Sequence, residues 1–234
     1  MSALRQIIWK FGLLAICLAL LNPFMGSPAG ASEHTAPPVL RFEQISLREG
    51  LSQSSVYAIL QDSFGFLWFG TEGGLNQYDG YQFTVYKHDP DNPDTISDNI
   101  ISALFEDQEG NIWAGTGLGL DRLDRATGTF THYQNDPEDP GSLSGTTVWA
   151  IFEDSQGTLW LGTNDGGLNR LDRSTGKFTH FRHDPADPDS IAGDSVKALY
   201  EDRQGVLWAG TDAGLDRFNR DRGSFTHYPR PVIN

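Results

Sequence analysis

One segment recurs four times in this 234-residue chain, and its tryptophans lie 45 to 48 residues apart. The copies begin at Val56, Ile101, Val148 and Val196. A period of this length is typical of stacked repeat folds and propellers. Residues present in every copy are predicted to maintain the fold by packing or turn formation. They are Trp68, Trp113, Trp160 and Trp208; Gly70, Gly115, Gly162 and Gly210; and Asp62, Asp107, Asp154 and Asp202.

Each copy contains four short runs that alternate apolar and polar residues as strands do. In the third copy they are Val148–Glu153, Leu159–Thr163, Leu168–Asp172 and Phe178–Phe181. An Asp-x-x-Gly turn follows the first run, where the carboxylate can accept backbone N–H groups and glycine supplies a positive φ. We therefore predict an all-β fold of four four-stranded antiparallel propeller blades.

The connection between copies is long and rich in proline, as in HDPDNPDTIS, NDPEDPGSLS and HDPADPDSIA. It must cross three strand spacings of about 4.8 Å to start the next blade. The Val/Ile-x-Ala run is therefore predicted to be innermost, and the Phe-Thr-His-Tyr run outermost. Several carboxylates lie close together in these loops but lack the Asp-x-Asp-x-Asp-Gly pattern of calcium loops. We interpret the loops as stiff crossovers and predict no metal site.

The N-terminus has the pattern of a secretory signal peptide. Arg5 and Lys10 precede the apolar run Phe11–Leu21, and Ala29-Gly30-Ala31 forms a small-x-small cleavage site. We predict a signal peptide over 1–31 and a linker over 32–38, hence a periplasmic or otherwise extracytoplasmic protein. An uncleaved anchor is the alternative. Cleavage would remove the single cysteine, and no later apolar stretch predicts a membrane span.

The formal net charge of −14 disfavours nucleic acid as a partner, because phosphates would be repelled. It is compatible with neutral sugars, cations or a basic protein surface. A solvated acidic surface is the simpler explanation.

After the linker we predict a lead-in that contains a closing strand, at 39–55. Four blades follow, at 56–95, 96–142, 143–190 and 191–234. The closing strand is Val39–Ile45. The fourth copy has an outermost run of its own, Phe225–Tyr228, so no position remains for a closing strand to fill. We predict an open arc or a fragment of a larger propeller that could associate through its edges. A compact four-bladed ring is the alternative.

The recurring histidines do not indicate catalysis or metal binding. His132, His180 and His227 occupy equivalent places on separate outermost runs, which should point apart, and His88 lies just beyond the corresponding run. Asp154, Gly157 and Trp160 are similar to the Asp-box of sialidase-type propellers, with one extra residue between Asp and Gly. The arginine cluster and acid–base pair of those enzymes are not found. LDRSTGKFTHF resembles a quinoprotein turn but lacks its tryptophan. We predict no enzyme activity and no cofactor, with a propeller hydrolase or lyase as an alternative.

Positions that differ between copies are candidates for ligand recognition. The second residue of the innermost run is Tyr57, Ser102, Trp149 and Lys197 in turn, near the predicted axis. The aromatic residues could stack on a sugar ring and Lys197 could donate hydrogen bonds. Neutral drift is the alternative explanation.

The runs FGFLWFGTEGGLNQYDG, GTLWLGTNDGGLNRLD and GVLWAGTDAGLDRF resemble the repeat of the two-component regulator propeller family, over residues 39–234. The resemblance implies the extracytoplasmic sensor of a signalling protein, followed in the family by a further β-domain, a transmembrane helix and a cytoplasmic kinase or cyclase. It also implies an oligosaccharide or another small extracellular ligand. This sequence has four repeats and no output domain. We expect a sensor or ligand-binding module separated from its output half, with a standalone periplasmic binding or scaffold propeller as the alternative.

Overall fold

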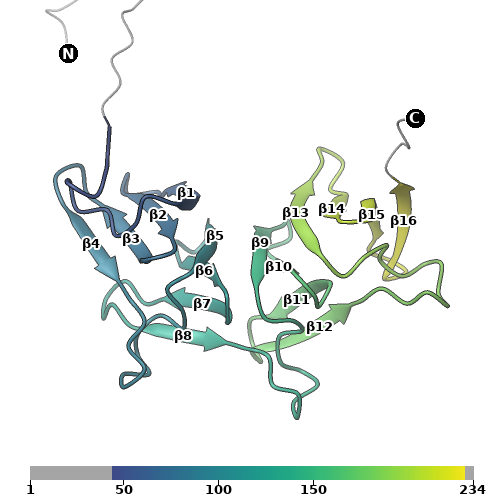
Figure 1. Ribbon diagram of the computed structural model, residues 1–234. Coiled ribbons are helices and arrows are strands. Elements are labelled where there is room, and N and C mark those ends of the chain that lie inside the picture. The colour runs from purple at the N-terminus through teal and green to yellow at the C-terminus, as the bar shows by residue number, and fades with distance from the viewer. Residues whose placement is uncertain (1–43, 230–234) are drawn as a thin grey trace, which may run out of the picture. The chain divides into compact units, whose positions relative to one another are not determined.

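The computed structural model describes residues 44–229, which form sixteen strands in four antiparallel sheets. Each sheet pairs four consecutive strands in chain order, which confirms the predicted all-β fold of four-stranded blades (Figure 1). The strands are β1 (Val56–Gln61), β2 (Leu67–Thr71), β3 (Gly74–Tyr78), β4 (Phe83–Tyr86), β5 (Ile101–Glu106), β6 (Ile112–Thr116), β7 (Gly119–Leu123), β8 (Phe130–Tyr133), β9 (Val148–Glu153), β10 (Leu159–Thr163), β11 (Leu168–Asp172), β12 (Lys177–Phe181), β13 (Val196–Glu201), β14 (Leu207–Thr211), β15 (Gly214–Asn219) and β16 (Ser224–Pro229). We call these sheets blades 1 to 4.

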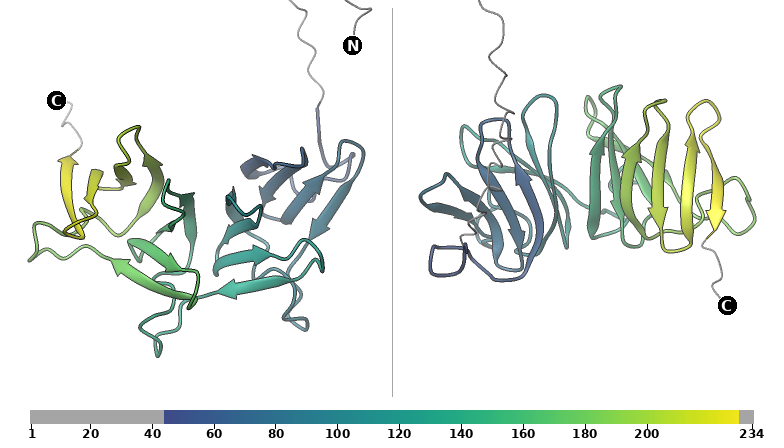
Figure 2. Two further views of the ribbon diagram at one scale, coloured as in Figure 1. Left: turned by 180° about the vertical axis from the view of Figure 1, so that it is seen from behind. Right: turned by 90° about the horizontal axis from the view of Figure 1, so that it is seen from above.

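The order of strands within a blade agrees with the prediction from loop length. β1, β5, β9 and β13 are the strands that contact one another from blade to blade, so they are innermost. β4, β8, β12 and β16 lie at the other edge of each sheet. The long crossovers follow these outermost strands, as Figure 2 shows.

Three apolar cores join successive blades. One face of each sheet, which we call the forward face, packs on the rear face of the next sheet. Between blades 1 and 2, Trp68 and Leu75 of the forward face meet Ile101, Ile112 and Leu123 of the rear face. The other two interfaces repeat this arrangement around Trp113 and Trp160. Burying apolar surface stabilises each contact by about 25 cal/mol per Å² of buried area.

The recurring glycine of the Trp-x-Gly-Thr run is explained by the approach of the next blade. A Cβ added at Gly115 or Gly162 would lie 2.6 Å from the carbonyl oxygen of Val148 or Val196, the first residue of the following innermost strand. At Gly70 the corresponding oxygen, of Ile101, lies at 2.9 Å. A side chain at these positions would push two blades apart.

The region before β1 is described only from residue 44. Residues 1–43, which include the predicted signal peptide, the linker and most of the closing strand, lie outside the described part. Residues 44–46 are not in a strand, and 47–50 form a turn. Within residues 44–229, no hydrogen bond or ion pair links blade 1 to blade 4. That stretch also contains no helix long and apolar enough to cross a bilayer.

Candidate functional site

The four candidate ligand-binding residues all occupy the same irregularity of the innermost strand. In β1, β5 and β13 the register of the pairing with the second strand of the blade shifts between the first and the third residue. In β9 the pairing with the second strand passes over the second residue in the same way. Each candidate is therefore the unpaired residue of a β-bulge. Bulges redirect a side chain and are frequent next to binding sites. These positions are Tyr57, Ser102, Trp149 and Lys197.

The bulge residues differ in how much of their side chain is available. Tyr57 is 51% exposed and Trp149 is 41% exposed, and Lys197 is also exposed. Ser102 is engaged within the fold, because its hydroxyl donates 2.6 Å to the carbonyl of Val148 in the next blade. Three of the four residues can therefore meet a ligand, while Ser102 helps to join blades 2 and 3.

The β2–β3 turn and its equivalents lie at the same end of the strands as the bulges. Tyr57 donates its hydroxyl hydrogen bond to Glu72 of that turn, and this bond is the main reason that the pKa of Tyr57 is raised. Leu118 and Asp165 occupy the matching turns of blades 2 and 3 and are exposed. These turn residues were not among the predicted site residues. The available signal was that TEGG, TGLG, TNDGG and TDAG differ between copies as the bulge residues do.

The opposite end of the strands carries a repeated charge arrangement that the sequence analysis missed. In the third interface, Asp154 of blade 3 accepts a hydrogen bond of 2.7 Å from Nη1 of Arg220 in blade 4. Nη2 of the same arginine donates 3.0 Å to Glu201. Glu201 in turn accepts 2.7 Å from the backbone N–H of Ser155 in blade 3. The equivalent sets are Asp62, Ser63, Glu106 and Arg125, and Asp107, Gln108, Glu153 and Arg173.

The aspartate at the centre of this arrangement also organises its own turn. Oδ1 of Asp154 accepts from the N–H groups of Gln156 and Thr158, as predicted for the Asp-x-x-Gly turn, and Oδ2 accepts 2.6 Å from Nε1 of Trp160. Gly157 has a φ of 78°. Burial by itself raises the pKa of Asp154, but the hydrogen bonds from Trp160 and Arg220 outweigh it, so the pKa is lowered. Asp154 is thus an ionised, buried partner for Arg220.

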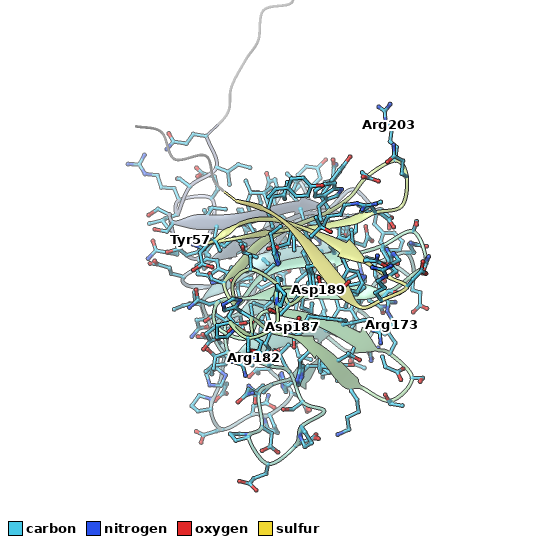
Figure 3. The ribbon with its side chains drawn as sticks, turned by 90° about the vertical axis from the view of Figure 1, so that its right-hand side faces the viewer. Tyr57, Arg173, Arg182, Asp187, Asp189 and Arg203 are labelled. Atoms are coloured by element: carbon cyan, nitrogen blue, oxygen red, sulfur yellow. The ribbon has the colours of Figure 1, made fainter. Side chains whose placement is uncertain are left out.

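Figure 3 shows that the two ends of the strands lie apart. Arg173 and Arg203 are at the end that carries the Asp-x-x-Gly turns, and Tyr57 is at the opposite end, with the bulges. The candidate ligand site and the charge arrangement are therefore separate features. The first varies between blades, and the second repeats.

The recurring histidines fix the crossover loops. Nε2 of His132, His180 and His227 lies 2.7 to 2.9 Å from a carbonyl oxygen of the loop that precedes the same blade. In blades 2 and 4, Nδ1 also contacts a fully buried carboxylate, Asp121 or Asp216. The hydrogen bond to that carboxylate is the largest cause of the raised pKa of His132 and His227. Blade 3 has Asn169 at the position of the carboxylate.

These two ion pairs predict a fall in stability at alkaline pH. A histidine whose pKa is raised on folding contributes fully below its unfolded pKa of about 6.5, and the contribution is lost as pH rises through the folded pKa. We expect the midpoint of thermal unfolding to decrease as pH is raised from about 6 to about 9. The double variant His132→Gln, His227→Gln should flatten this part of the profile.

The matched control for that prediction is His180→Gln, which removes a histidine that faces an asparagine. It should lower the melting temperature and leave both histidine–carboxylate pairs in place. A double variant that keeps the wild-type slope would contradict the assignment.

The fold and the repeated interfaces define the class of this protein: it is a β-propeller repeat protein. More narrowly, its four repeats are members of the two component regulator propeller family, whose model matches residues 50–73, 95–117, 142–165 and 190–213. This confirms the resemblance seen in the sequence.

Two known proteins illustrate what this chain is similar to. A curated histidine kinase, P4 of Formosa agariphila, is 46% identical over 56 residues, which is 24% of this chain and 4% of the kinase. The extracellular domain of a protein assigned as a hybrid two component system in B. thetaiotaomicron is 31% identical, with a TM-score of 0.60. That match covers 79% of this chain and 31% of the other. The chain thus spans only a small part of the length of these relatives.

The same fold also occurs in enzymes. Virginiamycin B lyase from Staphylococcus aureus superposes with a TM-score of 0.57 at 16% identity, covering 76% of this chain and 57% of the lyase. At that identity the similarity shows a shared propeller architecture. Function therefore has to be argued from the site.

Proposed function

We propose that this chain is the ligand-recognising part of an extracytoplasmic sensor in a two-component-type signalling system. The observation that carries the proposal is its 31% identity, over most of its described length, to the extracellular domain of a hybrid two component system. The 56-residue match to a histidine kinase supports the same role. The apolar N-terminal segment, which we interpret as a signal peptide, supports a location outside the cytoplasm.

The ligand in this proposal binds at the bulge end of the innermost strands. Tyr57, Trp149 and Lys197 are exposed there on the innermost strands of blades 1, 3 and 4, with Glu72 beside Tyr57. An aromatic face stacks on the apolar face of a sugar ring, and carboxylates or an ammonium group bind its hydroxyls. An oligosaccharide is the ligand class that this set of side chains fits best.

The proposal is tested by titrating a panel of neutral and acidic oligosaccharides into the mature chain by calorimetry. Trp149→Ala and Tyr57→Ala should each weaken binding about fivefold, because each removes a stacking surface. The control is Tyr81→Ala, which removes a fully exposed aromatic residue from the β3–β4 turn at the opposite end of blade 1.

Binding that is unaffected by the bulge variants, or equally weakened by the Tyr81 variant, would refute the site. Absence of binding across the panel would refute the ligand class. The same mixtures should release no new reducing ends and no unsaturated products. Turnover there would favour a hydrolase or lyase over a sensor.

A further inference from the structure

The crossover loops that enter blades 3 and 4 are held to their outermost strands in the same way. Phe178 in β12 and Phe225 in β16 each donate a backbone hydrogen bond of 2.8 Å to a carbonyl of the loop. Two residues before that carbonyl stands an aspartate, Asp139 or Asp187. Its Oδ1 accepts 3.0 Å from the N–H of the residue that carries the carbonyl. The two aspartates therefore occupy equivalent places, each with Oδ2 left for another partner.

In blade 3 this place binds an ammonium group of the chain itself. Oδ2 of Asp139 accepts 2.5 Å from Nζ of Lys177, the first residue of β12. The hydrogen bond from Lys177 is the largest cause of the lowered pKa of Asp139. The stem of the lysine lies over Gly141, because a Cβ added there would be 2.8 Å from Cδ of Lys177.

Blade 4 does not have this internal partner. Ser224 begins β16 where Lys177 begins β12, so a hydroxyl stands in place of the ammonium group. Asp189 stands where the loop of blade 3 has Gly141, which adds a second carboxylate. Among the ion pairs of residues 44–229, none involves Asp187 or Asp189.

The place left open in blade 4 belongs to a cavity of about 400 Å³ between the outer edges of blades 3 and 4. Sites for small molecules typically have volumes of about 300–1,000 Å³. Arg182, just after β12, and Arg222, in the β15–β16 turn, line this cavity from the two blades. Asp187 and Asp189 line it from the loop, and Figure 3 shows both aspartates in the same region as Arg182.

The lining carries charges of both signs that do not contact one another. Within the described residues neither Arg182 nor Arg222 forms an ion pair, although two aspartates line the same cavity. The side chain of Arg182 donates one hydrogen bond, of 3.3 Å, to the carbonyl of Asp165. A guanidinium binds a carboxylate through paired N–H donors, and a carboxylate binds an ammonium group as Asp139 does. The cavity therefore offers a partner for one group of each charge.

We propose that this cavity binds a small zwitterion, an amino acid or a related molecule that carries a primary ammonium group and a carboxylate. The ammonium group binds Asp187 and Asp189, at the place that the lysine fills in blade 3. The carboxylate binds Arg182 and Arg222. An ion of a single charge would leave two of these side chains unmatched. The site goes beyond the proposed oligosaccharide site, because it lies at the outermost strands and not at the bulges of the innermost ones.

The test is titration of the mature chain with glycine, β-alanine and γ-aminobutyrate. Binding is followed by nuclear magnetic resonance at the backbone amides of Asp189, Ser224 and Phe225. The matched probes with a single charge are n-butylamine, which is the lysine side chain as a free molecule, and butyrate. We expect saturable shifts with at least one zwitterion, and binding at least about fivefold weaker for each singly charged probe.

Two variants locate the binding. Asp187→Asn should weaken binding of the best zwitterion at least about tenfold, because it removes a charge and keeps the shape of the side chain. The double variant Asp189→Gly, Ser224→Lys reproduces the residues of blade 3 and should abolish binding, because the introduced ammonium group fills the place. The control is Asp139→Asn, which removes the carboxylate of the filled place in blade 3 and should leave the affinity unchanged.

Four results would overturn the proposal. They are no saturable shift with any of the three zwitterions, binding that survives Asp187→Asn, equal weakening by Asp139→Asn, and n-butylamine that binds as tightly as the zwitterions. If the double variant does not melt cooperatively, Arg182→Gln, Arg222→Gln takes its place. That variant should reduce the affinity for the zwitterion to that for n-butylamine, and an unchanged affinity contradicts the proposal.

Discussion

Replacing Asp154 with alanine is expected to lower the free energy of unfolding by about 3–5 kcal/mol. The carboxylate is fully buried and accepts hydrogen bonds from Trp160, Thr158 and Arg220. Its removal leaves the indole N–H and two turn N–H groups without their acceptor, and it leaves the guanidinium of Arg220 without one of its two carboxylates. The measurement is denaturant unfolding of the wild type and the variant.

The chain contains its own control for this prediction. Asp202→Ala removes the same hydrogen bonds from the turn and the tryptophan of blade 4, but no arginine is paired there among the described residues. It should cost much less than Asp154→Ala. Equal losses for Asp154→Ala and Asp202→Ala would show that the interface arginine contributes nothing to stability.

Gly162→Ala is expected to cost about 1–3 kcal/mol through overpacking. The added methyl group would lie 2.6 Å from the carbonyl oxygen of Val196 and 2.8 Å from its Cγ1. Backbone atoms of a paired strand cannot move away without separating blades 3 and 4. Thermal and denaturant unfolding of the variant measure the loss.

Gly210→Ala is the matched variant in blade 4, where the nearest atom to the new methyl is 3.4 Å away. Neither glycine has a left-handed backbone, so alanine introduces no strain of its own at either place. We expect a change within about 0.5 kcal/mol for Gly210→Ala. A loss as large as that of Gly162→Ala would contradict the explanation by inter-blade contact.

The sequence was sufficient for the strands and for their order in each blade. In the third repeat, three of the four predicted strands have the bounds of β9, β10 and β11, and the fourth differs only in that β12 begins at Lys177. Alternation and turn residues determine these elements locally, within one repeat. The length of the crossover loops was enough to place Val148–Glu153 innermost, because only one geometry spans that distance.

The interface between blades could not be predicted in the same way. Asp154, Arg220 and Glu201 come together only when one repeat is stacked on the next, and no pattern within a single repeat shows this. One signal was available in the sequence, because the interface arginine and glutamate are missing together from one repeat. Blade 1 lacks both the arginine and the glutamate, with Gln61 at the position of Glu201, as expected if the two residues act together.

The candidate ligand site was predicted in part. The bulge that redirects Tyr57 and Trp149 follows from the register between strands, which sequence spacing does not reveal. Ser102 looked equivalent to its counterparts, but its hydroxyl is used to bind the next blade. The contacts of His132 with Asp121 were missed because the two residues lie on different strands and face each other only in the paired sheet.

A double-mutant cycle on Asp154 and Arg220 tests most directly whether these blades are joined by a specific charge contact. Unfolding free energies are measured for Asp154→Ala, Arg220→Ala, the double variant and the wild type. The structure predicts a coupling energy of about 2 kcal/mol or more, with the double variant losing much less than the sum of the single variants. Additive losses would mean that the two side chains do not interact.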